Sequence, residues 1–134
     1  MQQQLEKIVR QFGADTGTLH LLENDVLVLK AHQGIPLPVV KIVTQVPIGK
    51  GMAGLAAARN EPVSSCDIQT DTSGNVRPGA TQTGVNGAIV VPIRDTQGRV
   101  QGTVGIGVHR EYTYTQEETR RLLLEAAKLV PQGR

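Results

Sequence analysis

A glycine-rich hexapeptide is the part of the sequence whose residue types and spacing could bind a ligand. Residues 49–54 read G-K-G-M-A-G, which fits the pattern G-x-G-x-x-G of dinucleotide-binding turns. A doubly wound dinucleotide domain needs two βαβαβ halves, and a motif that begins at Gly49 leaves too little of a 134-residue chain for both. We therefore interpret Gly49 and Gly51 as a tight turn and Gly54 as a close contact between helix and sheet. A phosphate site at the N-terminus of the following helix, or a dinucleotide site, is the alternative.

The single cysteine, Cys66, is the only side chain of the sequence suited to thiol chemistry. One cysteine forms neither an intramolecular disulfide nor a multi-cysteine zinc site. We expect a buried, unreactive thiol, because free cysteines usually behave as small apolar side chains. A redox-sensing or ligand-contacting thiol at the mouth of a cleft is the alternative.

The three histidines, His20, His32 and His109, are the candidate metal ligands, and all lie in predicted strands. If Asn24 and Asp25 form a two-residue turn, His20 pairs with Leu29 and His32 with Gly17. This pairing places the first two histidines on opposite faces of the sheet, where they could not share a metal ion. We find no Ser-His-Asp set, paired carboxylates or metal-ligand spacing, so we expect no metal site and no catalytic residues.

Composition narrows the classes of protein and partner. The 134 residues fit a single domain, 1–134, with a core over about 5–130. Fourteen basic and 12 acidic residues give a net charge of +2 without a block of one sign, which argues against nucleic-acid and membrane-surface binding. No stretch is apolar enough to span a membrane, and the N-terminus does not read as a signal peptide, so we expect a cytoplasmic protein. No aromatic residue lies between residues 13 and 111 to stack on a flat ligand, and we expect no cofactor.

Hydrophobic periodicity predicts the elements that must position these residues. An apolar stripe every three to four residues predicts an N-terminal helix that ends near Gly13, and Thr115 with Glu118 has the spacing of a capping box at the start of a C-terminal helix. Alternating runs around two tight turns predict antiparallel hairpins over 16–34 and 87–109. Between them we expect short helices near 38–43 and 51–59, short strands ending near residues 48 and 66, and an irregular loop over 67–86. The economical arrangement is an antiparallel sheet with helices on both faces.

The last predicted strand suggests where a ligand could lie. Its residues Thr103, Gly105 and Gly107 share one face and leave room above the sheet, while valine and isoleucine occupy the other. The C-terminal helix has an apolar band wider than one sheet-facing stripe requires, which favours a homodimer formed through the terminal helices.

Three segments of the sequence together resemble a GAF domain: VPIGKGMAGLAAARNEPV, GVNGAIVVPIRDTQGRVQGTVGIGVHR and YTQEETRRLLLEAA. The resemblance extends from about Leu5 to Val130. It implies a three-layer α+β fold of the profilin-like type, with a central six-stranded antiparallel sheet, the terminal helices on one face, often forming a dimer, and a ligand cleft on the other. It does not fix the ligand, since members bind cyclic nucleotides, tetrapyrroles, amino acids, small ions or nothing known.

Three known specialisations of the family are not matched by this sequence. The members that reduce free methionine sulfoxide use several cysteines, whereas Cys66 stands alone. The members that attach a tetrapyrrole commonly have histidine after the cysteine, where this chain has Asp67. The N-K-x-x-F…D-E signature of the cyclic-nucleotide binders is absent.

The sequence therefore leads to a non-catalytic sensory or regulatory domain. We expect an unknown small molecule between the sheet and the 67–86 loop, and a signal that leaves through the terminal helices of a homodimer or of a fused signalling protein. The expected ligand-binding residues are Cys66, Asp67, Arg77, Ile89, Val91, Thr103 and Gly105. One alternative is an interaction module whose cleft is filled by its own side chains. The other is an enzyme like the methionine sulfoxide reductases, which with a single cysteine would need an external thiol.

Overall fold

A six-stranded antiparallel sheet forms the centre of the molecule in the computed structural model, which describes residues 1–76 and 83–131. The strand order is β3-β2-β1-β6-β5-β4, and every neighbouring pair is antiparallel. The strands are β1 (Thr16–Glu23), β2 (Val26–Gln33), β3 (Gln45–Pro47), β4 (Val63–Ser65), β5 (Gly87–Arg94) and β6 (Val100–Val108). The helices are α1 (Gln2–Gln11), α2 (Leu37–Val43), α3 (Gly51–Arg59) and α4 (Gln116–Ala127), with a 3₁₀ helix, η1, at Ile68–Thr70.

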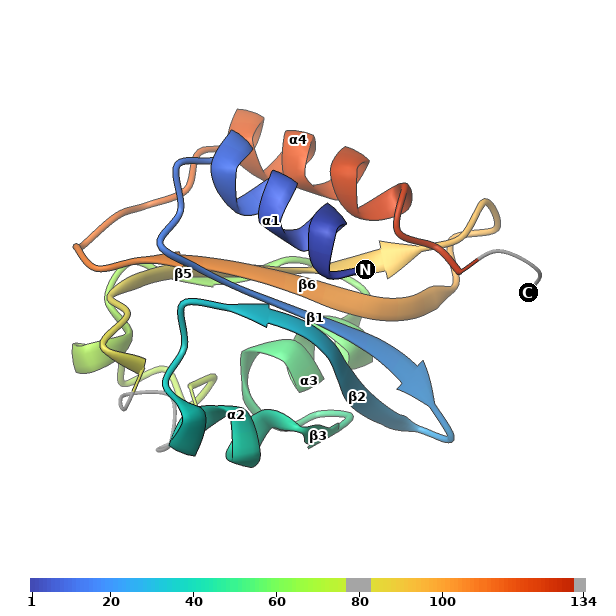
Figure 1. Cartoon of the computed structure of the whole chain (residues 1–134), viewed down its shortest axis with the longest axis horizontal. Coiled ribbons are helices and arrows are strands. Elements are labelled where there is room, and N and C mark those ends of the chain that lie inside the picture. Colours follow the sequence, from blue (N-terminus) through green and yellow to red (C-terminus); the bar gives the residue numbers. More distant parts are fainter. Residues whose placement is uncertain (77–82, 132–134) are drawn as a thin grey trace.

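The helices cover the two faces of the sheet in pairs. The terminal helices α1 and α4 lie side by side on one face, and α2 and α3 lie on the other (Figure 1). This arrangement confirms the predicted three-layer α+β fold. Among the described helices, none combines the length and the apolar character needed to cross a membrane.

The main core lies between the terminal helices and the sheet. Leu5, Ile8 and Val9 of α1 and Leu122 and Ala126 of α4 are buried there. The strands contribute buried apolar residues of one parity, among them Leu19, Leu21, Ile89, Val91, Ile93, Val104 and Ile106. Full burial of a leucine or isoleucine contributes about 1.5–3 kcal/mol, so this layer is a major source of stability.

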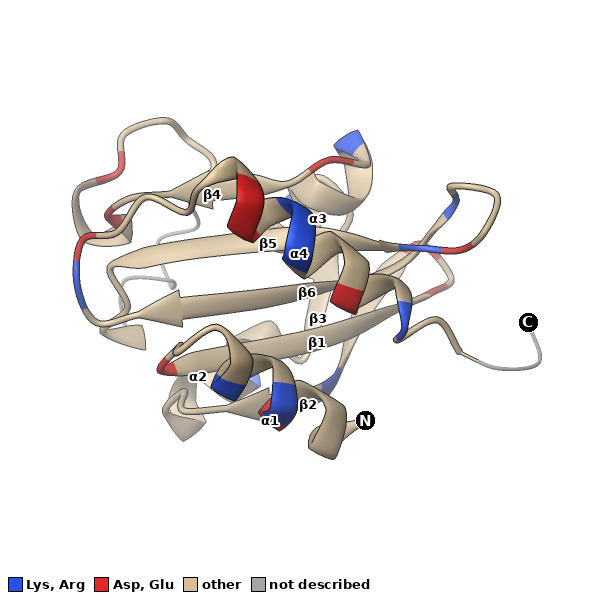
Figure 2. Cartoon of the chain, turned by 90° about the horizontal axis from the view of Figure 1, so that it is seen from above, with Lys and Arg blue, Asp and Glu red and all other residues tan. Residues whose placement is uncertain are grey.

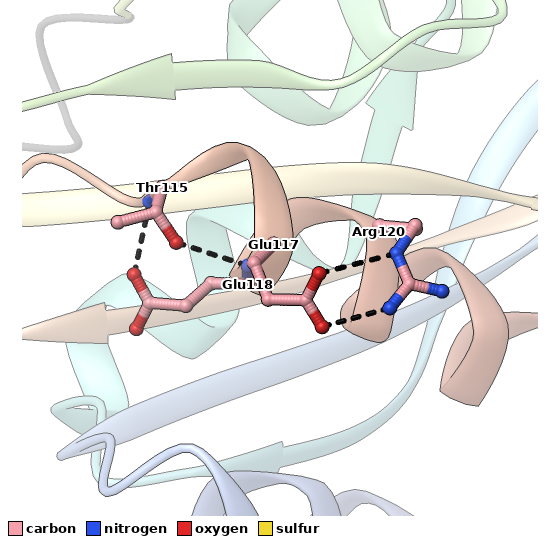
Figure 3. Close-up of polar contacts among 4 residues, drawn as sticks. All are labelled: Thr115, Glu117, Glu118 and Arg120. Atoms are coloured by element: carbon pink, nitrogen blue, oxygen red, sulfur yellow. Dashed lines mark hydrogen bonds and ion pairs between the residues drawn. The ribbon is translucent and has the colours of Figure 1, made fainter.

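The C-terminal helix begins at the predicted capping box (Figure 3). The Thr115 hydroxyl accepts a hydrogen bond from the Glu118 N–H at 3.0 Å, and the Glu118 carboxylate accepts one from the Thr115 N–H at 2.9 Å. One turn further on, the Arg120 guanidinium donates to the Glu117 carboxylate at 2.7 Å. Along α4 the acidic pair Glu117 and Glu118 of the first turn is followed by the basic pair Arg120 and Arg121, and acidic Glu125 comes after them, so neither sign dominates the helix (Figure 2).

The first hairpin has the predicted two-residue turn and a register that the sequence did not predict. Asn24 and Asp25 both have positive φ, as a tight hairpin turn requires. His20 pairs with Leu29 as expected, but Leu19 pairs with Ala31, so Lys30 is an extra residue in a β-bulge. His32 consequently pairs with Thr18 and lies on the same face as His20. The prediction that the two histidines lie on opposite faces is wrong, because one extra residue reverses the alternation beyond it.

Candidate functional site

The face of the sheet below α2 and α3 holds two adjoining cavities. The first, of about 160 Å³, is open to solvent on one side and is lined by α2, by residues 50–53 at the start of α3, and by the sheet residues Thr18, His20 and Val90. The second, of about 120 Å³, lies over Thr16, Thr18, Gly105 and Gly107 and reaches Ile68. The two have lining residues in common, and these are Thr18, Met52, Thr83 and Val90. The cavities therefore form neighbouring compartments of one candidate site.

Small residues on β1 and β6 create this space. Gly105 pairs with Thr18, and Gly107 pairs with Thr16, so no bulky side chain rises from this part of the sheet. A methyl group at Gly105 would lie 3.0 Å from the Val90 side chain, so even alanine there would encroach on the lining of the second cavity. The sheet leaves the room that the glycine pattern of the last strand predicts.

The start of α3 supplies the polar end of the first cavity. Gly49 and Gly51 have φ values of +90° and +66°, and they form the turn that leads from β3 into the helix. A methyl group at Gly54 would lie 2.4 Å from the Pro47 carbonyl oxygen, so the helix approaches β3 as closely as glycine allows. Lys50 is exposed at the N-cap position, and its side chain makes no capping hydrogen bond to the helix. The first-turn N–H groups of a helix lack intrahelical acceptors and carry partial positive charge, so this end favours an anion.

His20 is the buried titratable group of the first cavity. Its side chain is only 2% exposed, and its Nε2 lies 2.9 Å from the Val43 carbonyl oxygen. Because a carbonyl only accepts, Nε2 carries the proton and Nδ1 is left as an acceptor. Burial lowers the pKa of His20 and so favours this neutral form. No donor among the described residues reaches Nδ1.

Thr103 lies directly across from His20 in the β1–β6 register. It is completely buried, and its hydroxyl also has no hydrogen-bond partner among the described residues. A buried polar group without a partner usually costs about 1–3 kcal/mol, so two such groups on neighbouring strands are unusual. Thr103 therefore lies beside the cavity histidine, on the predicted face, but does not line either cavity.

The predicted residues Cys66 and Asp67 line neither cavity, although the next residue, Ile68, lines the second one. Cys66 follows the edge strand β4 and is exposed, so the prediction of a buried thiol is wrong. Asp67 is buried and accepts hydrogen bonds from the Gln69 N–H at 3.1 Å and the Asn86 amide at 3.0 Å. The bond from Asn86 is the main cause that lowers the pKa of Asp67. This carboxylate is engaged in capping the 3₁₀ helix.

The predicted residues Ile89 and Val91 lie on the wrong face of the sheet for the candidate site. They pair with Ile106 and Val104 and belong to the core below α1 and α4. Val90, between them, pairs with Gly105 and lines both cavities. The expectation that Ile89 and Val91 contact a ligand is therefore wrong, because residues paired across neighbouring strands share a face. Arg77 lies outside the described residues.

Several lining residues were not predicted, notably Thr18, His20, Lys50 and Val90. Lys50 lies inside the glycine hexapeptide, and the anion alternative for that helix end is the signal that could have identified it. His20 required knowledge of the β1–β6 pairing, which joins segments more than 80 residues apart. Among the described residues, no group of three His, Cys, Asp or Glu side chains could hold a metal ion.

The fold and the site define a class: α+β domains that cover one sheet face with their terminal helices and enclose cavities on the other. The family model of the GAF domain matches residues 1–130, and the chain belongs to this family. No curated protein matches the chain.

Solved structures from three organisms illustrate the range of similar proteins. The type II free methionine-R-sulfoxide reductase of Thermoplasma acidophilum is 21% identical, with a TM-score of 0.78 over 98% of this chain and 87% of that one. The GAF domain of a phosphoenolpyruvate-protein phosphotransferase from Coxiella burnetii is 23% identical, with a TM-score of 0.78 over 94% and 75%. The free methionine-R-sulfoxide reductase of Neisseria meningitidis, in complex with its substrate, is 22% identical, with a TM-score of 0.74 over 93% and 70%.

These comparisons overturn the expectation that the chain is not an enzyme. Two of the three similar structures are reductases, so the fold that the chain shares is used by enzymes as well as by GAF domains of other proteins. At 21–23% identity the likeness shows the fold alone. Membership of the family therefore does not argue against catalysis.

Proposed function

We propose that this GAF domain binds a small molecule in the adjoining cavities between the sheet and helices α2 and α3. The observation that carries the proposal is the first cavity, of about 160 Å³, which is lined by an apolar wall, the first turn of α3 and the side chain of the buried His20. Concave, mostly apolar sites with a few polar groups are typical of small-molecule binding. The alternative of a cleft filled by its own side chains is at odds with this space.

Two alanine-to-leucine substitutions in α3 test the proposal. Ala53 lines the first cavity, whereas Ala58 is exposed on the same helix. Native mass spectrometry of the purified protein, followed by denaturing conditions, should show an excess mass that is lost on denaturation. We expect Ala53→Leu to lose this mass, because the larger side chain fills the cavity, and Ala58→Leu to keep it.

A small neutral molecule shows whether the cavity can bind a ligand even if the purified protein carries none. If no bound mass is found, 3-methylbutan-1-ol should still shift the amide resonances of residues 50–53 and His20 in the wild type and leave them unshifted in Ala53→Leu. The proposal is overturned if the protein carries no molecule and the alcohol shifts neither set.

We further propose that binding alters the packing of the terminal helices in a homodimer. Leu124 of α4 is 55% exposed, and two pockets beside it, of about 90 and 260 Å³, involve Phe12, Leu123 and Ala127. Together with the partly buried Phe12 and Leu123 beside it, Leu124 forms apolar surface on this side of the terminal helices, which supports association through this face. Light scattering should show a dimer that Leu124→Glu dissociates. Leu37→Glu is the matched control, since Leu37 is 73% exposed on α2, and a monomeric wild type would contradict the proposal.

Thiol-dependent reduction is a second candidate function, favoured by the exposure of Cys66. The thiol would take the oxygen of a sulfoxide and become a sulfenic acid, releasing the thioether. Two external thiols would then remove that oxygen as water and restore the cysteine. Turnover of free methionine sulfoxide with dithiothreitol or thioredoxin, abolished in Cys66→Ser, would support this function. A wild type without turnover under both reductants would contradict it.

A further inference from the structure

The dipeptide Asn86-Gly87 lies at the start of β5, although this pair of residues is typical of hairpin turns. Of the asparagines in the chain, Asn86 alone is followed by glycine. Gly87 is part of the strand and does not have the positive φ of a turn glycine. The pair must therefore have a role here other than the formation of a turn.

Contacts with two distant segments account for both residues. A methyl group at Gly87 would lie 2.8 Å from the Cβ and the carbonyl oxygen of Tyr112, because the segment that joins β6 to α4 crosses the sheet at this point. The Asn86 side-chain amide donates to the Asp67 carboxylate at 3.0 Å, and the same carboxylate accepts the Gln69 N–H at 3.1 Å. The crossing segment requires glycine, and asparagine anchors the start of η1.

These two requirements bring together a chemically labile pair. Glycine has no side chain to hinder the attack of its nitrogen on the side chain of a preceding asparagine. In this reaction the Gly87 nitrogen would bond to Asn86 Cγ and close a five-membered succinimide, and the side-chain nitrogen would leave as ammonia with the proton that Gly87 loses. Water then opens the ring at one of its two carbonyl groups and leaves aspartate or isoaspartate. Water is the only other reactant.

The folded structure engages the groups that this reaction needs. The Gly87 N–H donates to the Arg110 carbonyl at 2.9 Å, so the attacking nitrogen is not free. The Asn86 N–H donates to the Val108 carbonyl at 2.9 Å, and the Asn86 carbonyl accepts the Ile68 N–H at 2.7 Å. Ring closure therefore requires a local opening of the strand, in which these bonds break together.

We infer that Asn86 is a deamidation site which the fold protects, and that its conversion irreversibly loosens this edge of the sheet. The new carboxylate would lie where the amide now donates to Asp67, and Glu111 already interacts with that carboxylate. The anchor of η1 would lose a hydrogen bond and gain a like-charge repulsion. Ile68 and Val85 line the second cavity, so the change would reach its wall. This inference goes beyond the proposed function, because it requires no ligand.

The rate of deamidation of the full-length wild type tests the inference first. The protein is incubated in mildly alkaline buffer with and without denaturing urea, and mass spectrometry of proteolytic peptides locates each conversion. In urea, Asn86 should convert faster than Asn24, Asn60 and Asn75, which precede bulkier residues. In the folded protein its conversion should be about a hundredfold slower than in urea, because only the small open population reacts.

A pair of aspartate variants tests the part played by the anchor. Asp67→Ala removes the acceptor of the Asn86 amide, so conversion of Asn86 in the folded protein should become about tenfold faster, as the loss of a hydrogen bond to a charged group allows. Asp71→Ala is the control, because that carboxylate accepts hydrogen bonds from Ser65 and Ser73. Amide hydrogen exchange of Gly87 should accelerate in parallel, and an unfolding curve establishes that each variant is folded.

Two variants of Asn86 itself test the consequence of the modification. Asn86→Asp reproduces the aspartate product, whereas Asn86→Ala removes the same donor without adding a charge. The midpoint of urea unfolding should be lower for Asn86→Asp than for Asn86→Ala at neutral pH, because only the former places a second carboxylate against Asp67. Equal midpoints overturn the predicted repulsion.

The rates decide the remaining parts of the inference. Protection by the fold is overturned if Asn86 converts as fast in the folded wild type as in urea. A chain in urea that converts another asparagine faster overturns the assignment of the site. An Asp67→Ala variant that reacts no faster than Asp71→Ala overturns the role of the anchor. None of these results depends on whether the cavities bind a molecule, so they are independent of the test of the proposed function.

Discussion

Thr103→Val is expected to stabilise the protein, although it removes a polar group from a completely buried position. The hydroxyl of Thr103 has no hydrogen-bond partner among the described residues, and valine has nearly the same shape. An unsatisfied buried hydroxyl costs about 1–3 kcal/mol, and we take the lower value because neighbouring dipoles recover part of the loss. The free energy of unfolding should therefore rise by about 1 kcal/mol. With an unfolding entropy of about 2.1 cal/mol/K per residue, 134 residues convert this into a rise in Tm of about 3–4 °C.

Urea unfolding of the purified wild type and variant measures this difference directly. The midpoint should increase while the slope with denaturant stays constant, since the surface exposed on unfolding hardly changes. Thr113→Val is the control, because Thr113 is exposed and its change should stay within about 0.5 kcal/mol. A loss of 1 kcal/mol or more in Thr103→Val would refute the reasoning, because it would mean that the hydroxyl has a partner in solution.

Three further predictions concern His20, Gly54 and Thr115. Burial lowers the folded-state pKa of His20, so its contribution to stability is complete above the unfolded pKa of 6.5 and is lost as the pH falls towards the folded value. The free energy of unfolding should fall between pH 7.5 and 5.5 with a slope of at most about 1.4 kcal/mol per pH unit, and His20→Gln should flatten it. Gly54→Ala should lose about 2 kcal/mol in urea unfolding, since its methyl group would lie 2.4 Å from the Pro47 carbonyl oxygen. Thr115→Ala should lose about 1 kcal/mol with the capping bond to Glu118, measured by thermal unfolding against Thr113→Ala.

The elements of the fold were predictable wherever a local signal determined them. Asn24 and Asp25 form the turn of the first hairpin, and Asn60 ends α3 in a left-handed conformation. Thr115 and Glu118 form the capping box at the start of α4. Each of these signals depends on only a few consecutive residues, so it can be recognised from the local sequence alone. The order of elements and the antiparallel sheet followed from them.

The candidate site was less predictable because it depends on pairing between distant segments. The glycines of β6 correctly indicated open space above one sheet face. Which residues of β5 shared that face depended on the register, and the choice of Ile89 and Val91 missed it by one position. One position is enough to move a side chain from the cavity to the core, since side chains alternate along a strand.

The bulge at Lys30 shows why a single irregularity matters for the site. A strictly alternating β2 would have paired His32 with Gly17 on the helix-covered face, where a polar ring would have had to enter the core beside Leu5 and Val9. The extra residue instead lets buried Ala31 pack below the terminal helices while His32 pairs with Thr18 on the cavity side. With the bulge, apolar Ala31 faces the core and polar His32 faces the cavity side of the sheet. The position of the bulge therefore follows from where the apolar residues of β2 must be buried, and a prediction that allowed it would have placed both histidines on the cavity side of the sheet.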